Sequence, residues 1–282
     1  MSTTITSRNE FNLTEADFRF IADIIYRHAG IVLSDKKSDL VQSRLGRRIR
    51  ALQLNSFKDY CDYIKNPQGS EEMTVMTNAL TTNLTSFYRE AHHFDHLKSV
   101  ALPEFKSLSS KNGRRLRLWS SACSTGEEPY SIAMTLLDYG IDRKSWDVRV
   151  LATDLNTEVL NSASAGLYSP EICEKLPSHL RQRFIEPHSQ DERFAVKPDV
   201  KDLITFKQLN LLGNWPMRQP FDVIFCRNVL IYFDAETKSK LIDRFIGLLR
   251  PGGWLYLGHS ETLNSDSHGL VLSGRTIYRR EA

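Results

Sequence analysis

The sequence predicts an α/β protein in which a small all-helical domain precedes a larger domain built on a mainly parallel sheet. Two observations predict this class. Over the first 80 or so residues, apolar side chains recur at helical spacing between capping signals. From Leu116 onward, strand-like runs alternate with helical patterns, which favours a parallel sheet with covering helices. We therefore expect a helical domain at residues 1–80, a linker and helix at 81–110, and the sheet domain at 111–282.

The helical domain is predicted to contain four short helices. In the first, Thr14 and Asp17 have the spacing of a capping box, and Gly30 is expected to end the helix. An Asn-Pro-Gln-Gly turn at 66–69 should separate the third helix from the fourth. The other three helices are expected to start at capping serines, Ser34, Ser56 and Ser70.

The sheet domain is predicted from five apolar runs that alternate with helical patterns. These runs are residues 116–120, 148–153, 204–208, 223–226 and 254–257. A sixth run, 276–279, follows Ser-Gly too closely for a helical crossover, so we expect it to be antiparallel to its neighbour. Charges, prolines and a short strand-like run at 193–197 interrupt the alternation, which indicates an inserted antiparallel β-subdomain at about 178–208.

The composition is that of an ordinary globular protein. The 282 residues carry a net charge of +3, from 37 basic and 34 acidic side chains, so overall charge does not indicate a nucleic-acid partner. No signal peptide or membrane-spanning run is recognisable, and we expect a monomeric protein of the cytoplasm without membrane insertion. The four cysteines form no CxxC pair, so we expect reduced thiols and no metal site.

The most informative segment is 119–131, where a buried strand gives way to small residues and then to a helix. Small side chains let a ligand approach the backbone, and the amides of a helix N-terminus supply donors. Asp154 ends the next strand, the position at which doubly wound nucleotide-binding sheets hold ribose hydroxyls on a carboxylate. The alternative is that Asp154 only caps the helix that starts near Asn156.

The same loop narrows the choice of cofactor. It contains the single glycine Gly126 rather than a GxGxxG motif, and the carboxylates of Glu127 and Glu128 would repel a pyrophosphate. Both observations disfavour NAD and FAD. A phosphate-free nucleoside with a cationic sulfonium suits an acidic loop better, so S-adenosylmethionine is the favoured cofactor.

The segment 80–90 between the two domains is rich in short hydrogen-bonding side chains. Asn83, Thr85 and Arg89 could fold over the cofactor, with the guanidinium of Arg89 presenting a fork suited to a carboxylate. The alternative is a helix cap followed by an ordinary helix. We expect the segment to contribute to the cofactor site.

Polar residues also follow two other predicted strands. Arg227 and Asn228 come after a buried run that ends at Cys226, and Asn210 comes after the run 204–208. Ligands of open parallel sheets bind beyond the carboxyl ends of the strands, so these side chains should lie at one edge. Tyr232 follows a few residues later. Each of these residues, taken alone, could equally have a structural role.

One helix of the N-terminal domain has a basic face. Arg44, Arg47 and Arg48 fall at positions i, i+3 and i+4, and Arg50 is nearby. Such a face is either only solvated or attracts an acidic protein surface or a nucleic acid backbone. No aromatic residues are interleaved with these arginines, which weakens the case for single-stranded nucleic acid.

Several longer motifs resemble one family. They are the segments 80–94, 124–131, 152–154, 225–233 and 251–261. In this order they resemble the chemotaxis receptor methyltransferases of the CheR family, from about residue 13 to residue 278. The resemblance implies a class I, Rossmann-like methyltransferase fold. It also implies transfer of a methyl group from S-adenosylmethionine to glutamate γ-carboxylates of chemoreceptors, giving methyl esters and S-adenosylhomocysteine.

The resemblance further implies roles for individual residues. Arg89 and Tyr232 would lie near the transferred methyl group, and the helix with Arg44, Arg47, Arg48 and Arg50 would dock on the receptor. The matched motifs give this set of cofactor-binding residues: Asn83, Thr85, Arg89, Glu128, Asp154, Asn210, Leu211, Arg227 and Asn228.

The residue types agree with this chemistry. A glutamate carboxylate is already ionised at neutral pH, so the reaction needs placement rather than a strong base. Family members that bind a C-terminal receptor pentapeptide share a glycine-containing loop, whereas residues 186–193 contain no glycine, which argues against pentapeptide tethering. Two other functions fit less well: an S-adenosylmethionine-binding module without catalysis, and a dinucleotide oxidoreductase, whose phosphate loop is missing.

Overall fold

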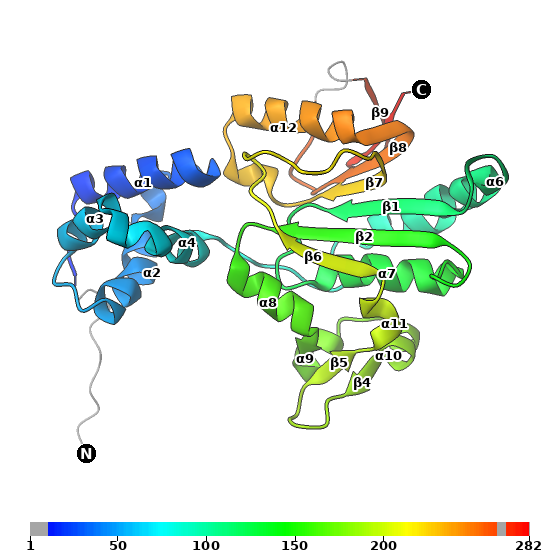
Figure 1. Cartoon of the computed structure of the whole chain (residues 1–282), viewed down its shortest axis with the longest axis horizontal. Helices are drawn as coiled ribbons and strands as arrows, with labels where there is room; N and C mark the ends of the chain where they lie inside the picture. Colours follow the sequence, from blue (N-terminus) through cyan, green and yellow to red (C-terminus); the bar gives the residue numbers. More distant parts are fainter. Residues whose placement is uncertain (1–10, 264–268, 282) are drawn as a thin grey trace. The chain divides into compact units, whose positions relative to one another are not determined.

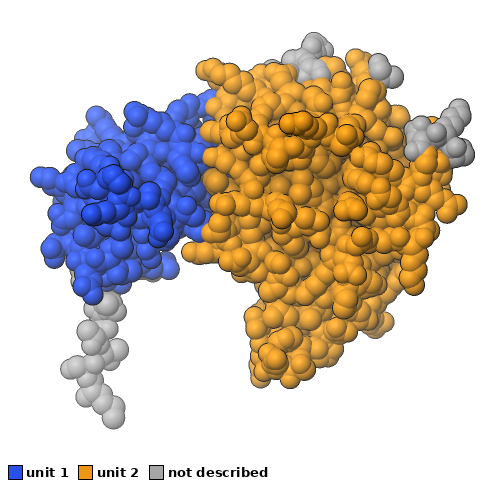
Figure 2. Space-filling view, viewed as in Figure 1, with its two compact units in different colours: residues 1–82, 232–234 blue, residues 83–231, 235–282 orange. Residues whose placement is uncertain are grey.

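A computed structural model describes residues 11–263 and 269–281, and the contacts within the chain divide it into two units (Figures 1 and 2). Unit 1 takes residues 1–82 together with the short segment Tyr232–Asp234. Unit 2 takes Asn83–Ile231 and Ala235–Ala282. A segment between two strands of unit 2 thus belongs to unit 1 by its contacts.

Unit 1 is all-helical, as the sequence predicts. It contains α1 (Glu15–Ala29), α2 (Ser38–Ala51), α3 (Phe57–Lys65) and α4 (Ser70–Leu80), with the short 3-10 turns η1 (Asp35–Lys37) and η2 (Pro67–Gly69). The apolar faces of these helices form a core in which Ile21, Leu45 and Tyr60 have no exposed surface. Burial of these faces, rather than helix propensity, holds such short helices together.

The start and end of α1 follow the predicted capping chemistry. The Thr14 hydroxyl oxygen accepts from the Asp17 backbone N–H at 3.2 Å, and the Asp17 carboxylate accepts from the Thr14 N–H at 3.3 Å. Gly30 ends the helix with φ of 69°, a left-handed conformation that costs glycine little. The capping box and the glycine stop are both confirmed.

Of the three capping serines, only Ser56 is confirmed. Its hydroxyl accepts from the Asp59 backbone N–H at 3.1 Å at the start of α3. The predictions for Ser34 and Ser70 are wrong, because neither side chain makes a capping bond. In both places a 3-10 turn runs directly into the α-helix, so carbonyls of the turn accept from the first helical N–H groups; the Ser70 N–H, for example, donates to Pro67.

Unit 2 alternates strands and helices. Its main sheet consists of β1 (Arg115–Ser120), β2 (Asp147–Asp154), β6 (Ile204–Gln208), β7 (Phe221–Cys226), β8 (Leu249–Leu257), β9 (Leu270–Gly274) and β10 (Ile277–Arg280). Its helices are α5 (His92–His96), the π-helical turn η3 (Leu97–Ala101), α6 (Leu102–Asn112), α7 (Glu127–Tyr139), α8 (Thr157–Ala165), α9 (Pro170–Cys173), α10 (Ser178–Phe184), α11 (Pro198–Lys201) and α12 (Ala235–Leu248).

The strands of the main sheet lie in the order β6-β2-β1-β7-β8-β10-β9 (Figure 1). Neighbours from β6 to β8 pair in parallel, whereas β10 is antiparallel to both β8 and β9. The mainly parallel sheet and the antiparallel last strand are therefore confirmed. The sequence reading missed β9, whose few exposed apolar residues show no clear alternation with polar ones.

Side chains of β1 show how the sheet is covered. Leu116 and Leu118 lie in one buried cluster with Leu136 of α7. Trp119 points to the opposite face, because side chains alternate along a strand, and its ring centroid lies 5.2 Å from that of Phe245 in α12. Helices thus cover both faces of the sheet, the arrangement that parallel strands require.

A second, smaller sheet is antiparallel, as expected for the insertion. Its order is β3 (Leu167–Tyr168), β5 (Phe194–Val196) and β4 (Ile185–Pro187). It begins before the predicted range of 178–208, because β3 is too short to produce a recognisable pattern. The strand at the end of that range, β6, pairs with β2 in the main sheet.

Candidate active site

The chain topology fixes where a ligand would bind. From β1 the chain runs outward through β2 and β6, and then crosses to β7 and β8 on the other side of β1. The carboxyl ends of β1 and β7 therefore mark the point at which the strand order reverses, where open α/β sheets bind ligands. Most of the predicted site residues of unit 2 follow these strands or their neighbours.

The loop after β1 needs glycine at position 126. Gly126 precedes α7 with φ of 99°, and a Cβ there would lie 2.9 Å from the Ala163 Cβ and from the Tyr168 hydroxyl. The Tyr168 hydroxyl also donates to the Thr125 carbonyl at 2.7 Å. Ser124, with φ of 49°, completes a tight turn. The loop is thus held in one shape by α8 and the small sheet.

Asp154 connects this loop to the end of β2. One oxygen of its carboxylate accepts from the Ser124 backbone N–H at 2.8 Å, and the other accepts from the Asn156 N–H at 2.9 Å. The interpretation of Asp154 as a helix cap is wrong, because the Asn156 side chain caps α8 instead. Burial raises the pKa of Asp154, although these N–H donors oppose the rise.

The two glutamates of the loop have different surroundings. Glu127 accepts from the Thr125 hydroxyl at 2.7 Å, and burial raises its pKa. Glu128 accepts from the Ser120 hydroxyl at 2.7 Å on one oxygen and from the Arg227 guanidinium at 2.9 Å on the other. Burial also raises the pKa of Glu128, against the opposing effect of Arg227. Glu128 is thus anchored to the ends of both β1 and β7.

Arg227 is the centre of a buried charged group. Its side chain is 1% exposed and forms ion pairs with Glu128 at 2.9 Å and with Glu90 at 3.3 Å. It also donates to the backbone carbonyl of Arg89. The structure therefore brings the Arg89 backbone, Glu128 and Arg227 together from segments that lie far apart in the sequence.

Glu261 is a buried acidic residue of this region that was not among the predicted site residues. Its buried carboxylate accepts from the backbone N–H groups of Gly258 at 2.7 Å, Asn228 at 2.8 Å and Ile231 at 3.3 Å. It therefore joins the ends of β7 and β8 and fixes Asn228, whose φ is 56°. Glu261 belongs to the 251–261 motif, but the residue type of a single acidic residue in a loop does not reveal its backbone partners, which also include Leu230.

Comparison with known proteins decides the family. Residues 16–81 match the all-alpha domain of CheR methyltransferases, and residues 83–278 match their SAM-binding domain. The chain belongs to the CheR methyltransferase family. It is 45% identical to a Rhizobium etli protein named "Probable chemotaxis protein methyltransferase", over 91% of this chain and 96% of that one. It is 43% identical to the Escherichia coli "Chemotaxis protein methyltransferase", over 94% and 91% of the two chains.

Membership of the CheR family confirms the predicted fold class, the methyltransferase activity and S-adenosylmethionine as the cofactor. The donor set fits this cofactor. Residues 121–128 contain two carboxylates and no arginine or lysine, so the loop suits a nucleoside without phosphates. Asp154 adds a carboxylate at the end of β2, suited to vicinal hydroxyls.

The remaining predicted cofactor residues of the CheR domain lie in loops. The Asn83 carbonyl accepts from the Ser124 hydroxyl at 2.9 Å, which ties the 80–90 segment to the β1 loop. Thr85 is half-buried. The Asn210 side chain accepts from the Leu212 N–H at 2.9 Å, and Leu211 is buried after β6. The alternative of an ordinary helix starting within 80–90 is wrong, since α5 begins only at His92.

Among the predicted catalytic residues, Tyr232 belongs to unit 1. The Tyr232 carbonyl accepts from the Val32 N–H at 2.9 Å, and its hydroxyl donates to the Thr82 carbonyl at 3.2 Å. Lys37 lies 5.7 Å from the centroid of the Tyr232 ring. Tyr232 thus belongs to the helical unit by three separate contacts.

The four arginines of α2 fall into two kinds. Arg44 donates to the carbonyls of Ala79 and Thr81 at 3.1 and 2.6 Å, and Arg48 forms a two-pronged pair with buried Glu72 at 2.9 and 2.8 Å. These two side chains hold α2 against α4. Arg47 and Arg50 are exposed.

The described residues hold no group of three or more His, Cys, Asp or Glu side chains arranged for a metal ion. No helix in residues 11–263 or 269–281 combines the length and hydropathy needed to cross a bilayer. The four cysteines are buried free thiols.

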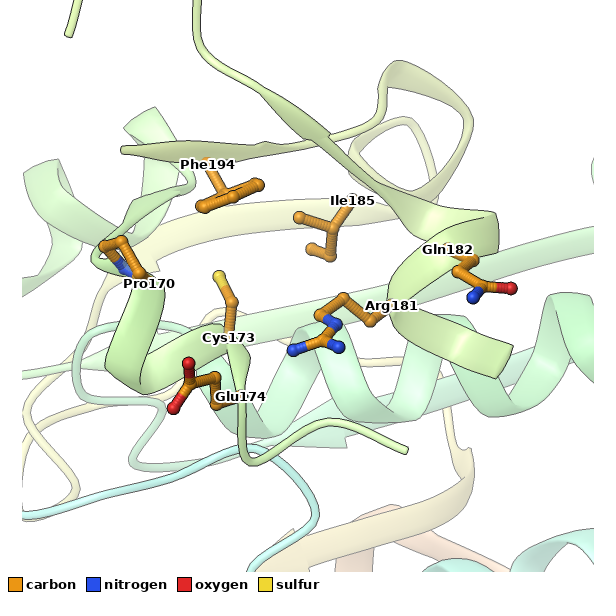
Figure 3. Close-up of a pocket in the computed structure, with 7 residues that line it drawn as sticks. All are labelled: Pro170, Cys173, Glu174, Arg181, Gln182, Ile185 and Phe194. Carbon is orange, nitrogen blue, oxygen red and sulfur yellow. The ribbon is translucent and has the colours of Figure 1, made fainter. Parts of the chain in front are cut away.

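A separate pocket of about 230 Å³ lies among α9, α10, β4 and β5 of unit 2 (Figure 3). Cys173, Arg181, Ile185 and Phe194 point toward it. Within the described chain, none of the residues predicted for the cofactor site lines this pocket.

Proposed function

We propose that this enzyme transfers a methyl group from S-adenosylmethionine to the γ-carboxylate of glutamates in the cytoplasmic helices of chemoreceptors, and so adjusts chemosensory signalling. Relatives that this chain matches over nearly their whole length are named chemotaxis protein methyltransferases, which supports this role. The observation that carries the proposal is the place of Arg89. It lies in the 80–90 segment, which the Ser124 hydroxyl ties to the β1 loop through the Asn83 carbonyl, and its guanidinium donates to the Leu84 carbonyl at 2.8 Å.

The main catalytic task of the protein is to position the glutamate carboxylate against the methyl group of the cofactor. A glutamate carboxylate is the nucleophile in its ordinary ionised form, and the bound cofactor supplies a methyl group on a sulfonium. Arg89 would pair with the incoming carboxylate, and Tyr232 would donate a hydrogen bond to it. Both groups orient a nucleophile that needs no deprotonation, which agrees with the absence of a catalytic base from the proposed set.

We propose that the cofactor is held by the predicted set in unit 2. Asp154 would accept from the ribose hydroxyls, because a carboxylate has about four lone-pair sites and that of Asp154 accepts from the backbone N–H groups of Ser124, Asn156 and Leu155. Asn83, Thr85, Arg89, Asn210, Leu211 and Asn228 would line the rest of the site. Glu128 and Arg227 would act as a pair, since each is already bound to the other.

Two arginines of α2 are proposed to dock the receptor. Arg47 and Arg50 are exposed and suit an acidic helical surface, whereas Arg44 and Arg48 are engaged by α4 and would support the helix. We propose that docking does not need a receptor pentapeptide, because the β4–β5 turn contains no glycine and is closed by Asp191, which accepts from the Arg193 N–H at 3.0 Å.

The docking proposal predicts a change in KM rather than in kcat. Arg47→Glu and Arg50→Glu should raise the KM for receptor membranes, and Lys58→Glu, the same charge change at an exposed position of α3, should not. Equal effects of all three would contradict a specific role for α2. Tight binding of a tethered receptor pentapeptide to the enzyme would contradict the pentapeptide proposal.

The main experiment follows the methyl group. The enzyme is incubated with methyl-labelled S-adenosylmethionine and receptor membranes, and label released as methanol by mild base identifies a carboxyl ester. Arg89→Ala should lower methyl transfer about 100-fold, and Tyr232→Phe should also lower it. Both variants should affect S-adenosylhomocysteine affinity less than methyl transfer. Arg218→Ala, which replaces an exposed arginine of unit 2, is the control. Cofactor binding without label on any receptor would instead indicate a binding module.

A further inference from the structure

The backbone on both sides of Arg89 adopts an unfavourable conformation. Tyr88 has φ of 52° and Glu90 has φ of 57°, so two residues with a Cβ lie in the left-handed region with Arg89 between them. Such conformations persist only where surrounding contacts hold them, and they cluster at functional sites.

Three groups fix the turn. On the N-terminal side, the Tyr88 N–H donates to the Ser131 hydroxyl of α7 at 3.0 Å. At the centre, the Arg227 guanidinium donates to the Arg89 carbonyl. On the C-terminal side, the carboxylate of Glu90 is the anchor, and its side chain is only 12% exposed.

Four side chains from three segments converge on the Glu90 carboxylate. One oxygen accepts from the His259 ring nitrogen Nδ1 at 3.0 Å, from the His259 N–H at 3.3 Å and from the Asn228 amide at 3.3 Å. The other lies 3.3 Å from the Arg227 guanidinium and 3.5 Å from the His93 ring nitrogen Nδ1. Residues after β7 and β8 and in α5 thus meet on one carboxylate.

We propose that Glu90 is a positioning residue that acts through Arg89. It holds the left-handed turn, and with Arg227 it sets the direction in which the Arg89 side chain leaves the backbone. None of the residue roles proposed above includes Glu90 or His259. The inference rests on the proposed role of Arg89 in orienting the acceptor carboxylate.

Binding of S-adenosylhomocysteine should tolerate loss of the Glu90 charge, because the sulfur of this product carries no charge. Arg227 keeps its pair with Glu128, and the backbone of Asn228 stays bound to Glu261. Glu90→Gln retains the size of the side chain and one acceptor oxygen, but it removes the charge that faces Arg227. The effect should therefore fall on the Arg89 turn, whereas a general structural defect would also weaken cofactor binding.

A double-mutant cycle tests the inference. Methyl transfer to receptor membranes and S-adenosylhomocysteine affinity are measured for wild type, Glu90→Gln, Arg89→Ala and the double variant, with Glu192→Gln as the same change at an exposed position. Arg89→Lys replaces Arg89→Ala as background if transfer falls below detection. We expect Glu90→Gln to lower kcat by about 10- to 100-fold, to change S-adenosylhomocysteine affinity by less than about threefold, and to have no further effect once Arg89 is replaced.

The possible outcomes separate the two proposals. Losses that multiply in the double variant, or an unchanged kcat in Glu90→Gln, would overturn the positioning role and leave the role of Arg89 intact. An unchanged kcat in Arg89→Ala would overturn both. A parallel loss of kcat and S-adenosylhomocysteine affinity in Glu90→Gln would show that Glu90 supports the site as a whole, which also overturns the inference.

Discussion

Replacing Arg227 by methionine is expected to destabilise unit 2 by about 3–5 kcal/mol, because it leaves two carboxylates in a poorly solvated place without their cation. The side chains of Arg227, Glu128 and Glu90 are 1%, 11% and 12% exposed. Methionine fills a similar space beside Phe94, over whose ring the guanidinium lies at 5.5 Å. The change therefore removes charge with little loss of packing.

The size of the loss in unfolding free energy should depend on the protonation state of Glu128. Its pKa is already raised by burial, and without Arg227 it should rise further, so Glu128 would take up a proton and limit the loss. Glu90 keeps donors from His259 and Asn228 and should suffer less. The double variant Arg227→Met/Glu128→Gln should therefore be more stable than Arg227→Met alone.

Tryptophan fluorescence reports on this unit alone. The four tryptophans, Trp119, Trp146, Trp215 and Trp254, all belong to unit 2. Urea unfolding followed at these residues gives the free energy for unit 2, and Arg218→Met, at an exposed position, is the control. A loss below about 1 kcal/mol, the range of surface pairs, or a double variant no more stable than the single one, would refute the reasoning.

Three further predictions concern single positions. Asp154→Asn should weaken S-adenosylhomocysteine binding by about 10- to 100-fold in calorimetry, since bonds to charged groups contribute about 1.5–3 kcal/mol; unchanged affinity would exclude Asp154 as the ribose ligand. Gly258→Ala would place a Cβ 2.5 Å from the Asn228 amide nitrogen and 2.7 Å from its backbone nitrogen, so thermal unfolding should shift down while Gly247→Ala, with open space around its Cβ, should not. Burial alone would raise the pKa of Glu90, but Arg227, His259 and Asn228 lower it to about 2. The ionised carboxylate therefore stabilises the fold at pH values above the pKa of an unfolded glutamate, about 4.3. The difference in unfolding free energy between wild type and Glu90→Gln should shrink as the pH falls from about 4 to about 2.

The fold could be predicted where the determining interactions are local or follow a strict period. The Thr14 capping box, the Gly30 stop and the β1, β2, β6, β7 and β8 runs are of this kind. The predictions of Ser34 and Ser70 as helix caps were wrong, because the residue type does not distinguish a serine at a helix cap from one beside a 3-10 turn. β3 and β4 are too short for a period, so only their pairing with β5 reveals them.

The site could be predicted in outline because a general rule places ligands at the carboxyl ends of parallel strands. That rule, with the family motifs, selected Asp154, the last residue of β2, and Arg227 and Asn228, which follow β7. It gave no means of seeing that Glu90 and Glu261 reach the same region, because Asn228, a partner of both, is distant in sequence and several of the other donors are backbone N–H groups. Such contacts depend on register and backbone conformation, which residue types alone do not encode.

The structure also changes the electrostatic argument for a cationic cofactor. From sequence, the adjacent Glu127 and Glu128 suggested an acidic loop open to the ligand. In the fold, Glu128 is paired with Arg227, and the pKa of Glu127 is raised by burial, so neither acts as an isolated negative charge. The relevant count is that of the buried group: Glu90 and Glu128 with the single guanidinium of Arg227 leave one negative charge in excess. A sulfonium would be attracted by this excess, and it would be repelled if Arg227 faced it alone.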